Sequence, residues 1–140
     1  MTGAAGFSGS HLVHRLVAGG RAVTALVRET TDLRRLEDVR TKIEIVSADI
    51  ADREKLAEAV KKINPLGVFH LAVSNMKSGV AAPAEELMRT NFLGTVNLID
   101  AANAVDYEFF IQTGSFLEYG MRDRPIKETD CGDPIELQSI

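Results

Sequence analysis

Three glycines near the beginning of the chain have the spacing of a loop that binds a pyrophosphate. The segment reads Thr-Gly-Ala-Ala-Gly-Phe-Ser-Gly and leads directly into apolar residues at helical spacing. Gly3 can take a tight turn, Gly6 leaves space for a phosphate, and Gly9 allows the helix to pack closely on a strand. The first helical turn would add free N–H groups and the positive end of the helix dipole. The loop predicts a dinucleotide site, but ordinary turns are also rich in glycine, so the neighbouring elements must decide.

The elements around this loop alternate between helices and short apolar strands. Helices are expected over residues 9–18, 31–39, 52–63 and 84–104, the third being capped by Asp52 and ended by Asn64-Pro65. Strands are expected over residues 21–28, 43–48, 66–73 and 108–113, with little regular structure from Gly114 onward. Continuously apolar strands are typical of a parallel sheet covered by helices on both faces. We therefore predict an α/β fold with a doubly wound parallel sheet, similar to the Rossmann fold.

The segment 84–104 carries two adjacent rows of mainly apolar residues. One row consists of Leu87, Asn91, Gly94, Leu98 and Ala101. The neighbouring row consists of Met88, Phe92, Thr95, Ile99 and Ala102. Because both rows are mainly apolar, we expect both to be buried.

Composition fits a single globular domain and excludes several classes of protein. The chain has 140 residues, 45% of them hydrophobic, and a net charge of −4, which gives no general attraction to nucleic acid or anionic lipid. No apolar run approaches the roughly 20 residues needed to cross a bilayer, and no signal peptide is visible. Cys131 is the single cysteine, so no internal disulfide can form. We expect a cytoplasmic protein with no nucleic-acid or membrane partner.

Only Met1 precedes the glycine loop, although a dinucleotide fold has a strand at this position. That strand is central in a doubly wound sheet, so its loss would leave the neighbouring strands unpaired. We therefore expect the first strand to be missing. Either the N-terminus has been trimmed or its start set wrongly, which we favour, or the chain is a fragment.

Five motifs follow one another along the chain. They are the glycine loop 2–9, Asp49-Ile50, His70-Leu71-Ala72-Val73, Asn91-Phe92-Leu93-Gly94-Thr95, and Thr113-Gly114-Ser115 followed by Tyr119-Gly120. Each motif is loose by itself. Together, in this order and on these elements, they resemble the extended short-chain dehydrogenase/reductase family. The resemblance covers nearly the whole chain. Within the family, the motifs look most like those of the nucleotide-sugar epimerases, dehydratases and ketoreductases.

This resemblance implies a site for NAD or NADP. The residues implied to bind the cofactor are Gly3, Gly6, Phe7, Ser8, Gly9, Arg28, Asp49, Ile50, Leu71, Ala72, Val73, Asn91 and Thr113. Ser115 is implied to be catalytic, holding the reacting oxygen in line by a hydrogen bond. Simpler roles stay open: Ser115 could satisfy backbone groups in its turn, Asp49 could cap the following helix, and Asn91 could be a packed helix residue. His70 is expected to act through its backbone, and no metal site is expected.

The choice between NAD and NADP depends on the end of the strand over 21–28. An acidic residue there favours the ribose hydroxyls of NAD, whereas an arginine favours the 2′-phosphate of NADP. Arg28 ends this strand, with Arg34-Arg35 nearby, and could make a charge-assisted contact with that phosphate. Glu29 could instead bind the ribose, and Arg28 could be an ordinary surface residue. We lean toward NADP.

The Tyr-x-x-x-Lys pair that carries catalysis in this family is not found in the chain. Neither Tyr107 nor Tyr119 has a lysine four residues later. Counted from Ser115, the family's tyrosine would fall at the last residue or just beyond it. We therefore expect residues 1–140 to be a dinucleotide-binding domain that is incomplete at both ends and lacks the substrate domain.

The function implied by the resemblance is transient hydride transfer at a carbon of a nucleotide-linked sugar. An NAD(P)-dependent epimerase, dehydratase or 4-ketoreductase would fit, and the sugar stays open. Phe116-Leu117 stand where dehydratases typically have an Asp-Glu pair, which slightly favours the other two reactions. Family members often form homodimers through a long helix that corresponds to 84–104. The alternative is a non-catalytic NAD(P)-binding sensor of the same fold, in which the absence of the Tyr-Lys pair needs no truncation.

Overall fold

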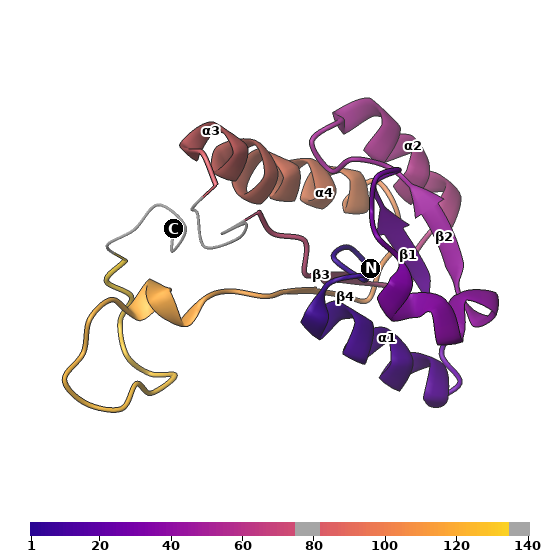
Figure 1. The fold of residues 1–140 in the computed structure, drawn as a ribbon. Helices are drawn as coiled ribbons and strands as arrows, with labels where there is room; N and C mark the ends of the chain where they lie inside the picture. Colours follow the sequence, from indigo (N-terminus) through magenta and orange to yellow (C-terminus); the bar gives the residue numbers. More distant parts are fainter. Residues whose placement is uncertain (75–81, 135–140) are drawn as a thin grey trace.

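The computed structural model describes residues 1–74 and 82–134, which form short parallel strands with helices between them (Figure 1). The strands are β1 (Thr24–Val27), β2 (Glu44–Ser47), β3 (Gly67–His70) and β4 (Phe109–Gln112). The helices are α1 (Phe7–Ala18), the 3₁₀ helix η1 (Arg34–Lys42), α2 (Arg53–Ile63), α3 (Ala84–Leu87), the π-helical η2 (Met88–Leu93), α4 (Gly94–Ala102) and the 3₁₀ helix η3 (Phe116–Tyr119). Each element expected from the sequence forms close to its expected position. Little regular structure was expected from Gly114 onward, but η3 forms there.

The ends of α2 follow from side chains that the sequence singles out. The Asp52 carboxylate accepts a hydrogen bond from the backbone N–H of Lys55 at 3.2 Å, which satisfies one free amide of the first turn. Asn64 ends the helix in the left-handed conformation, with φ 45°. The expected cap and the expected end of this helix are therefore confirmed.

Thr2 lies between two pairs of parallel strands, β2-β1 and β3-β4. It makes parallel bridges with Leu26 of β1 and with His70 of β3. The N–H of Leu26 donates to the carbonyl of Met1 at 2.9 Å, and the N–H of Thr2 donates to the carbonyl of Phe69 at 3.0 Å. Met1 and Thr2 thus occupy the central position of the sheet, and the strand order is that of a doubly wound α/β fold. The fold class expected from the sequence is confirmed.

Apolar side chains pack in two layers, one on each face of the sheet. The layer toward α2 and α4 comprises Leu26, Ala48, Ile50, Leu56, Ala59, Val60, Val68, Leu98, Ala101 and Ala102. The layer toward α1 and η1 comprises Ala4, Ala5, Val13, Val23, Ala25, Val27, Leu36 and Val39. Successive residues of β1 belong to opposite layers, as expected for a strand buried on both faces.

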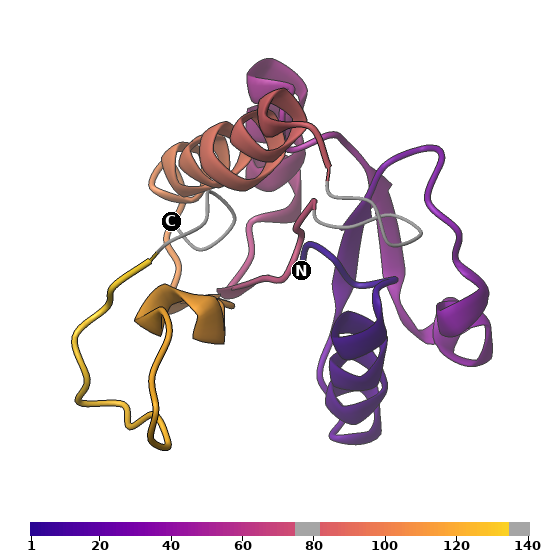
Figure 2. The same cartoon turned by 60° about the vertical axis from the view of Figure 1, so that its left-hand side comes forward.

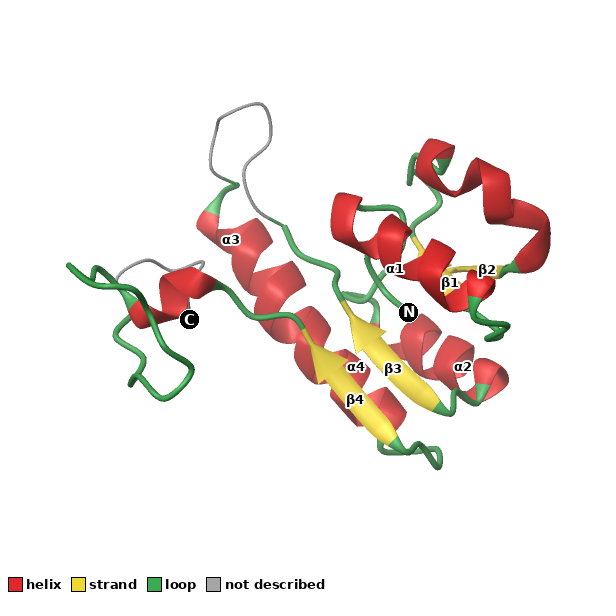
Figure 3. Ribbon diagram, turned by 90° about the horizontal axis from the view of Figure 1, so that it is seen from below, coloured by secondary structure: helices red, strands yellow, loops and turns green. Residues whose placement is uncertain are grey.

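One face of β3 and β4 has no helix over it among the described residues. Figure 3 shows α1 lying across β1 and β2, while β3 and β4 are open to the same side. Phe109 and Ile111 of β4 are 39% and 48% exposed. Helices therefore cover both faces of the sheet at β1, whereas among the described residues they cover one face at β3 and β4 (Figure 3).

The expected long helix forms but changes type in its middle, where η2 replaces α-helical with π-helical geometry. Leu87, Leu98 and Ala101 are buried, as expected for the first row. In the second row Ala102 is buried, but Phe92 is 56% exposed. Met88 and Ile99 of the same row are also exposed. The helix packs on α2 and the sheet with one face only, so the expected burial of these three residues is wrong.

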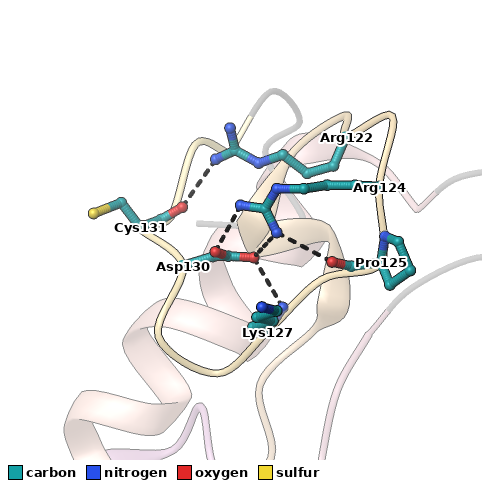
Figure 4. A network of polar contacts seen from close by, with 6 residues as sticks. All are labelled: Arg122, Arg124, Pro125, Lys127, Asp130 and Cys131. Carbon is teal, nitrogen blue, oxygen red and sulfur yellow. Dashed lines mark hydrogen bonds and ion pairs between the residues drawn. The ribbon is translucent and has the colours of Figure 1, made fainter.

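The Asp130 carboxylate joins several parts of the segment after η3. Arg124 donates two hydrogen bonds to Asp130 at 2.8 and 2.9 Å, and the backbone N–H of Lys127 donates a third (Figure 4). The hydrogen bonds from Arg124 lower the pKa of Asp130 to about 2. Arg122 donates to the carbonyl of Cys131 in the same turn. Figure 2 shows that this segment, coloured orange to yellow, stands apart from the sheet.

None of the helices in residues 1–74 and 82–134 is long and apolar enough to span a membrane.

Candidate functional site

The glycine loop turns tightly between Thr2 and α1. Gly3 has φ +65°, and a Cβ there would overlap the carbonyl group of Leu71, so both its conformation and its surroundings require glycine. A Cβ on Gly9 would overlap the carbonyl group of Gly3. The contact that requires glycine at position 9 is therefore with the loop itself, rather than with a strand as the sequence pattern predicted.

The N-terminus of α1 offers backbone donors to an anion. Gly6 is its N-cap and supplies no side-chain cap, and the first turn holds no acidic residue. Ser10 lies in the second turn, and its hydroxyl donates to the carbonyl of Phe7 at 2.9 Å. The first-turn N–H groups point beyond the helix end without intrahelical partners, where the dipole is positive. This is the arrangement that phosphate groups occupy at helix N-termini.

A cleft of about 710 Å³ opens beside this loop, at the carboxyl ends of the strands. Of the residues implied by the family resemblance, those lining it are Gly3, Gly6, Phe7, Ser8, Gly9, Arg28, Asp49, Ile50, Leu71, Ala72, Val73 and Thr113. Neither Asn91 nor Ser115 lines it. Open parallel sheets bind their ligands at this edge, at the point where the strand order reverses. Here that point lies at Thr2, between β1 and β3.

The cleft also has a wall that sequence reasoning did not assign. Thr31, Asp32 and Arg35 line it together with Arg28. The hydroxyl of Thr31 accepts a hydrogen bond from the N–H of Arg28 at 3.0 Å, and the N–H of Thr31 donates to the carbonyl of Arg28 at 2.9 Å. The turn after β1 therefore folds back and brings η1 to the cleft. In the sequence, only the Arg34-Arg35 pair close to Arg28 indicated that this segment could reach the cleft.

Some of the charged side chains in this wall have an ionic partner and others do not. Arg34 donates from Nε to the Asp32 carboxylate at 2.7 Å, and this side-chain hydrogen bond lowers the pKa of Asp32. Arg28 and Arg35 form no ion pair within the part of the chain that the structure describes. The wall therefore presents two cations to the cleft, while its carboxylate is already bound by a third.

Asp49 lines the cleft rather than capping α2. Its carboxylate accepts a hydrogen bond from the N–H of Ala51 at 2.9 Å and lies 3.5 Å from the Arg89 guanidinium. The cap of α2 is Asp52. The capping role that the sequence left open for Asp49 is therefore wrong. Its neighbour Ile50 is buried and fills the space that a side chain at position 94 would need.

Asn91 and Ser115 have local partners outside the cleft. The Asn91 amide holds the backbone of Ser74 on both sides, accepting from its N–H at 2.7 Å and donating to its carbonyl at 2.9 Å. The Ser115 hydroxyl accepts from the N–H of Leu117 at 3.2 Å and caps η3. Ser115 therefore satisfies a backbone group in its own turn, which is the simpler role that the sequence left open. Because its oxygen accepts in this contact, its hydroxyl proton stays available for another one.

A parallel sheet of this strand order, with a glycine loop and a helix N-terminus beside a cleft at its carboxyl edge, defines a dinucleotide-binding fold of the Rossmann type. A family model described as the NAD dependent epimerase/dehydratase family matches residues 1–139. The chain belongs to this family, as its motifs led us to expect.

Individual relatives agree with this assignment. UDP-glucose 4-epimerase of Mycolicibacterium smegmatis is 36% identical over 121 residues, which are 82% of this chain and 37% of that protein. Cinnamoyl-CoA reductase 1 of Petunia hybrida is 33% identical over 120 residues, 82% of this chain and 34% of that protein. The crystal structure of UDP-glucose 4-epimerase from Brucella ovis in complex with NAD superposes with a TM-score of 0.84 at 30% identity, covering 99% of this chain and 42% of that one. The chain thus spans little more than a third of the length of the curated relatives it matches.

Proposed function

We propose that residues 1–140 are the dinucleotide-binding domain of an NAD(P)-dependent enzyme. The observation that carries the proposal is the cleft itself, in which the glycine loop, the uncapped start of α1 and the carboxyl ends of the strands converge. The relative from Brucella ovis, whose structure is a complex with NAD, supports the same cofactor class. The match to the family along almost the whole chain supports an enzyme rather than a binding module of another kind.

The chain's own residues would hold the cofactor in separate ways. Amides of the loop over 3–9 would bind the diphosphate, because Gly3 and Gly9 leave no side chain in the way. Asp49 and Ile50 would lie at the adenine ring, and the segment 71–73 would lie along the nicotinamide half of the cofactor. When bound, the nicotinamide would accept a hydride from the substrate or return one.

The cofactor preference follows from the wall after β1, and we propose NADP. Arg28 and Arg35 line the cleft, whereas Glu29, the residue that could have bound the ribose hydroxyls of NAD, does not. Asp32 lines it too, but Arg34 already occupies its carboxylate. Two guanidinium groups that form no ion pair with a described carboxylate suit a 2′-phosphate better than a neutral ribose.

The substrate we propose is a nucleotide-linked sugar, altered by transient hydride transfer in an epimerase, dehydratase or 4-ketoreductase reaction. The relatives from Mycolicibacterium smegmatis and Brucella ovis are both named for UDP-glucose. The Petunia relative is named as a reductase of another substrate, which keeps carbonyl reduction among the reactions considered. Ser115 would hold the reacting oxygen through the hydroxyl proton that η3 leaves unused.

The cofactor proposal is tested by titrating the chain with NADPH and with NADH, following nicotinamide fluorescence and calorimetric heat. We expect saturable binding of one dinucleotide, tighter for NADPH. UDP-glucose serves as the ligand control, since a cleft that binds any nucleotide diphosphate would take it equally well. Failure of both dinucleotides to bind would overturn the proposal.

A non-catalytic NAD(P)-binding sensor is not favoured, because these relatives are named as epimerases and reductases. The coding sequence discriminates the two functions directly. An enzyme requires a tyrosine shortly after residue 140 with a lysine four residues later, as the family resemblance implies. A coding sequence that continues without this pair, or stops there, would support the sensor instead.

We propose that the protein forms a homodimer in the cytoplasm. The exposed apolar row along η2 and α4, which includes Phe92 and Ile99, supports a surface that a second copy covers. Cys131 is exposed and unpaired, as is usual in a reducing compartment.

A further inference from the structure

His70, at the end of β3, is buried and hydrogen-bonded through both ring nitrogens. Its side chain is 2% exposed. Nδ1 lies 2.6 Å from the Thr2 hydroxyl, and Nε2 lies 2.8 Å from the Thr95 hydroxyl. The ring therefore has structural partners of its own, beside the backbone role expected for this residue. Its ring does not line the cleft, but its partner Thr2 does, and its other partner, Thr95, lies on α4.

The neighbouring hydrogen bonds fix the direction of this chain of contacts. The Thr95 hydroxyl donates its proton to the carbonyl of Asn91 at 2.6 Å, so its oxygen must accept from Nε2–H of His70. Nδ1 then carries a lone pair and accepts from the Thr2 hydroxyl. The Thr2 oxygen in turn accepts from the N–H of Ala72 at 3.2 Å. A donor and an acceptor are thus assigned at every contact, and the ring is neutral with its proton on Nε2.

Burial supports this neutral form. It lowers the pKa of His70 to about 4. A second proton would sit on Nδ1 and point at the Thr2 oxygen, so that the Thr2 hydroxyl would lose the acceptor of its own proton. The neutral ring is therefore the form in which every hydrogen bond of the chain is made.

The elements joined in this way are two neighbouring segments of the cleft lining and the long helix. Thr2 immediately precedes Gly3, where the phosphate loop turns. Ala72 belongs to the segment 71–73, which lines the cleft directly beside Gly3. Thr95 is the second residue of α4, and in the preceding η2 the Asn91 amide holds the backbone of Ser74. One side chain thus connects the phosphate loop, the end of β3 and the long helix.

We propose that His70 is a positioning residue for dinucleotide binding, which fixes the spacing between the phosphate loop and the segment 71–74 through Thr2 and Thr95. The inference rests on the proposed function, because it assigns His70 an effect on cofactor affinity without contact to the cofactor. A polar chain that is fully satisfied can hold one geometry, and loss of a single member leaves the others without partners.

The test compares substitutions at the far end of the chain, away from the cleft. Thr95→Val keeps the shape of the side chain but removes the hydroxyl, and we expect the NADPH dissociation constant to rise about three- to tenfold. Thr95→Ser restores the hydroxyl and should restore the affinity of the unaltered chain. His70→Phe removes both contacts and should weaken binding further. Unfolding of each variant without ligand is measured beside the titration, because a merely structural role would change stability and leave affinity unchanged.

The outcomes separate this inference from the proposed function. If the unaltered chain binds NADPH and a folded Thr95→Val binds it equally well, His70 does not position the cleft and only this inference falls. If the unaltered chain binds no dinucleotide, the proposed function and the inference fall together. Nitrogen-15 NMR of the unaltered chain gives a check that needs no variant: a neutral His70 ring protonated on Nε2 is expected. A ring protonated on Nδ1 at neutral pH would overturn the chain of contacts.

Discussion

At Gly9 the phosphate loop has the least room for a side chain. A Cβ there would overlap the carbonyl group of Gly3, which is backbone and cannot rotate away. We expect Gly9→Ala to lower the free energy of unfolding by about 1–3 kcal/mol, the usual cost of overpacking. Because the loop must shift, NADPH should bind about tenfold more weakly or worse. Urea unfolding and NADPH titration measure the two effects.

Gly19 provides the matched control on the same helix. It ends α1 with φ −82°, and a Cβ there would lie 3.4 Å from the carbonyl oxygen of Leu16. Gly19→Ala should change stability by no more than about 0.5 kcal/mol and leave binding unchanged. Equal effects at positions 9 and 19 would contradict the claim that the close contact between Gly9 and Gly3 makes position 9 especially sensitive.

Arg28 should decide which dinucleotide the chain prefers. Arg28→Gln removes a cation that lines the cleft, and hydrogen bonds to charged groups are worth about 1.5–3 kcal/mol. We expect affinity for NADPH to fall about ten- to a hundredfold while affinity for NADH stays constant. Arg40→Gln, on the same η1 helix as Arg35 but away from the cleft, is the control. A parallel loss for both dinucleotides would assign Arg28 to the diphosphate instead.

His70 should make the chain less stable in mild acid. Burial holds the folded-state pKa at about 4, below the ordinary 6.5, so the unfolded chain binds the extra proton more readily between these values. The free energy of unfolding should therefore rise with pH from about 4 to 6.5 and become level above that, as far as His70 contributes. Urea unfolding of the unaltered chain and of His70→Asn across this range isolates the effect. Parallel curves for the two would contradict it.

At the scale of elements, local sequence signals identify helices and strands well but not their finer geometry. Asp52 and Asn64 mark both ends of α2, because each acts on the backbone beside it. The 3₁₀ form of η1 and the π-helical η2 have no comparable signal, since both depend on what the helix packs against. The same holds for Phe92, whose exposure is decided by the position of α2 and the sheet rather than by helical spacing.

The candidate site shows the same division. Sequence motifs located the glycine loop, Asp49 and the segment 71–73, all of which line the cleft. They could not show that Thr31 would fold the turn after β1 back toward it. Nor could they show that His70 would reach Thr2 and Thr95, because these contacts join residues 68 and 25 positions apart in the chain.

The cap of α2 offers a test of element stability. Asp52→Ala removes the acceptor of the Lys55 N–H, and loss of an N-cap costs about 1 kcal/mol. Asp52→Asn keeps an acceptor but removes the charge, and should cost only a few tenths of that amount. Thermal unfolding of both variants is the measurement. If Asn proves as costly as Ala, the exposed ion pair with Lys55 rather than the cap would be responsible.

At the scale of the whole molecule, the cleft and the exposed apolar row are separate surfaces. The cleft lies at the carboxyl edge of the sheet. The row carries Met88, Phe92, Val96 and Ile99, with exposures of 43%, 56%, 40% and 38%. These positions recur at helical spacing on one side of η2 and α4. A row of this kind on one continuous helical segment can meet its own copy across a twofold axis, since each residue then faces an equivalent apolar surface.

Phe92→Glu should therefore convert a dimer into a monomer, because it places a charge at the most exposed residue of that row. Sedimentation velocity at several protein concentrations measures the change, and circular dichroism checks that the fold is kept. Phe116→Glu is the matched control: Phe116 is 73% exposed but lies on η3, away from the row, so the dimer should survive. NADPH affinity should be the same for both variants, since neither residue lines the cleft. If the unaltered chain is already a monomer, the proposal that a second copy covers this row is wrong, and a different partner would have to explain its exposure.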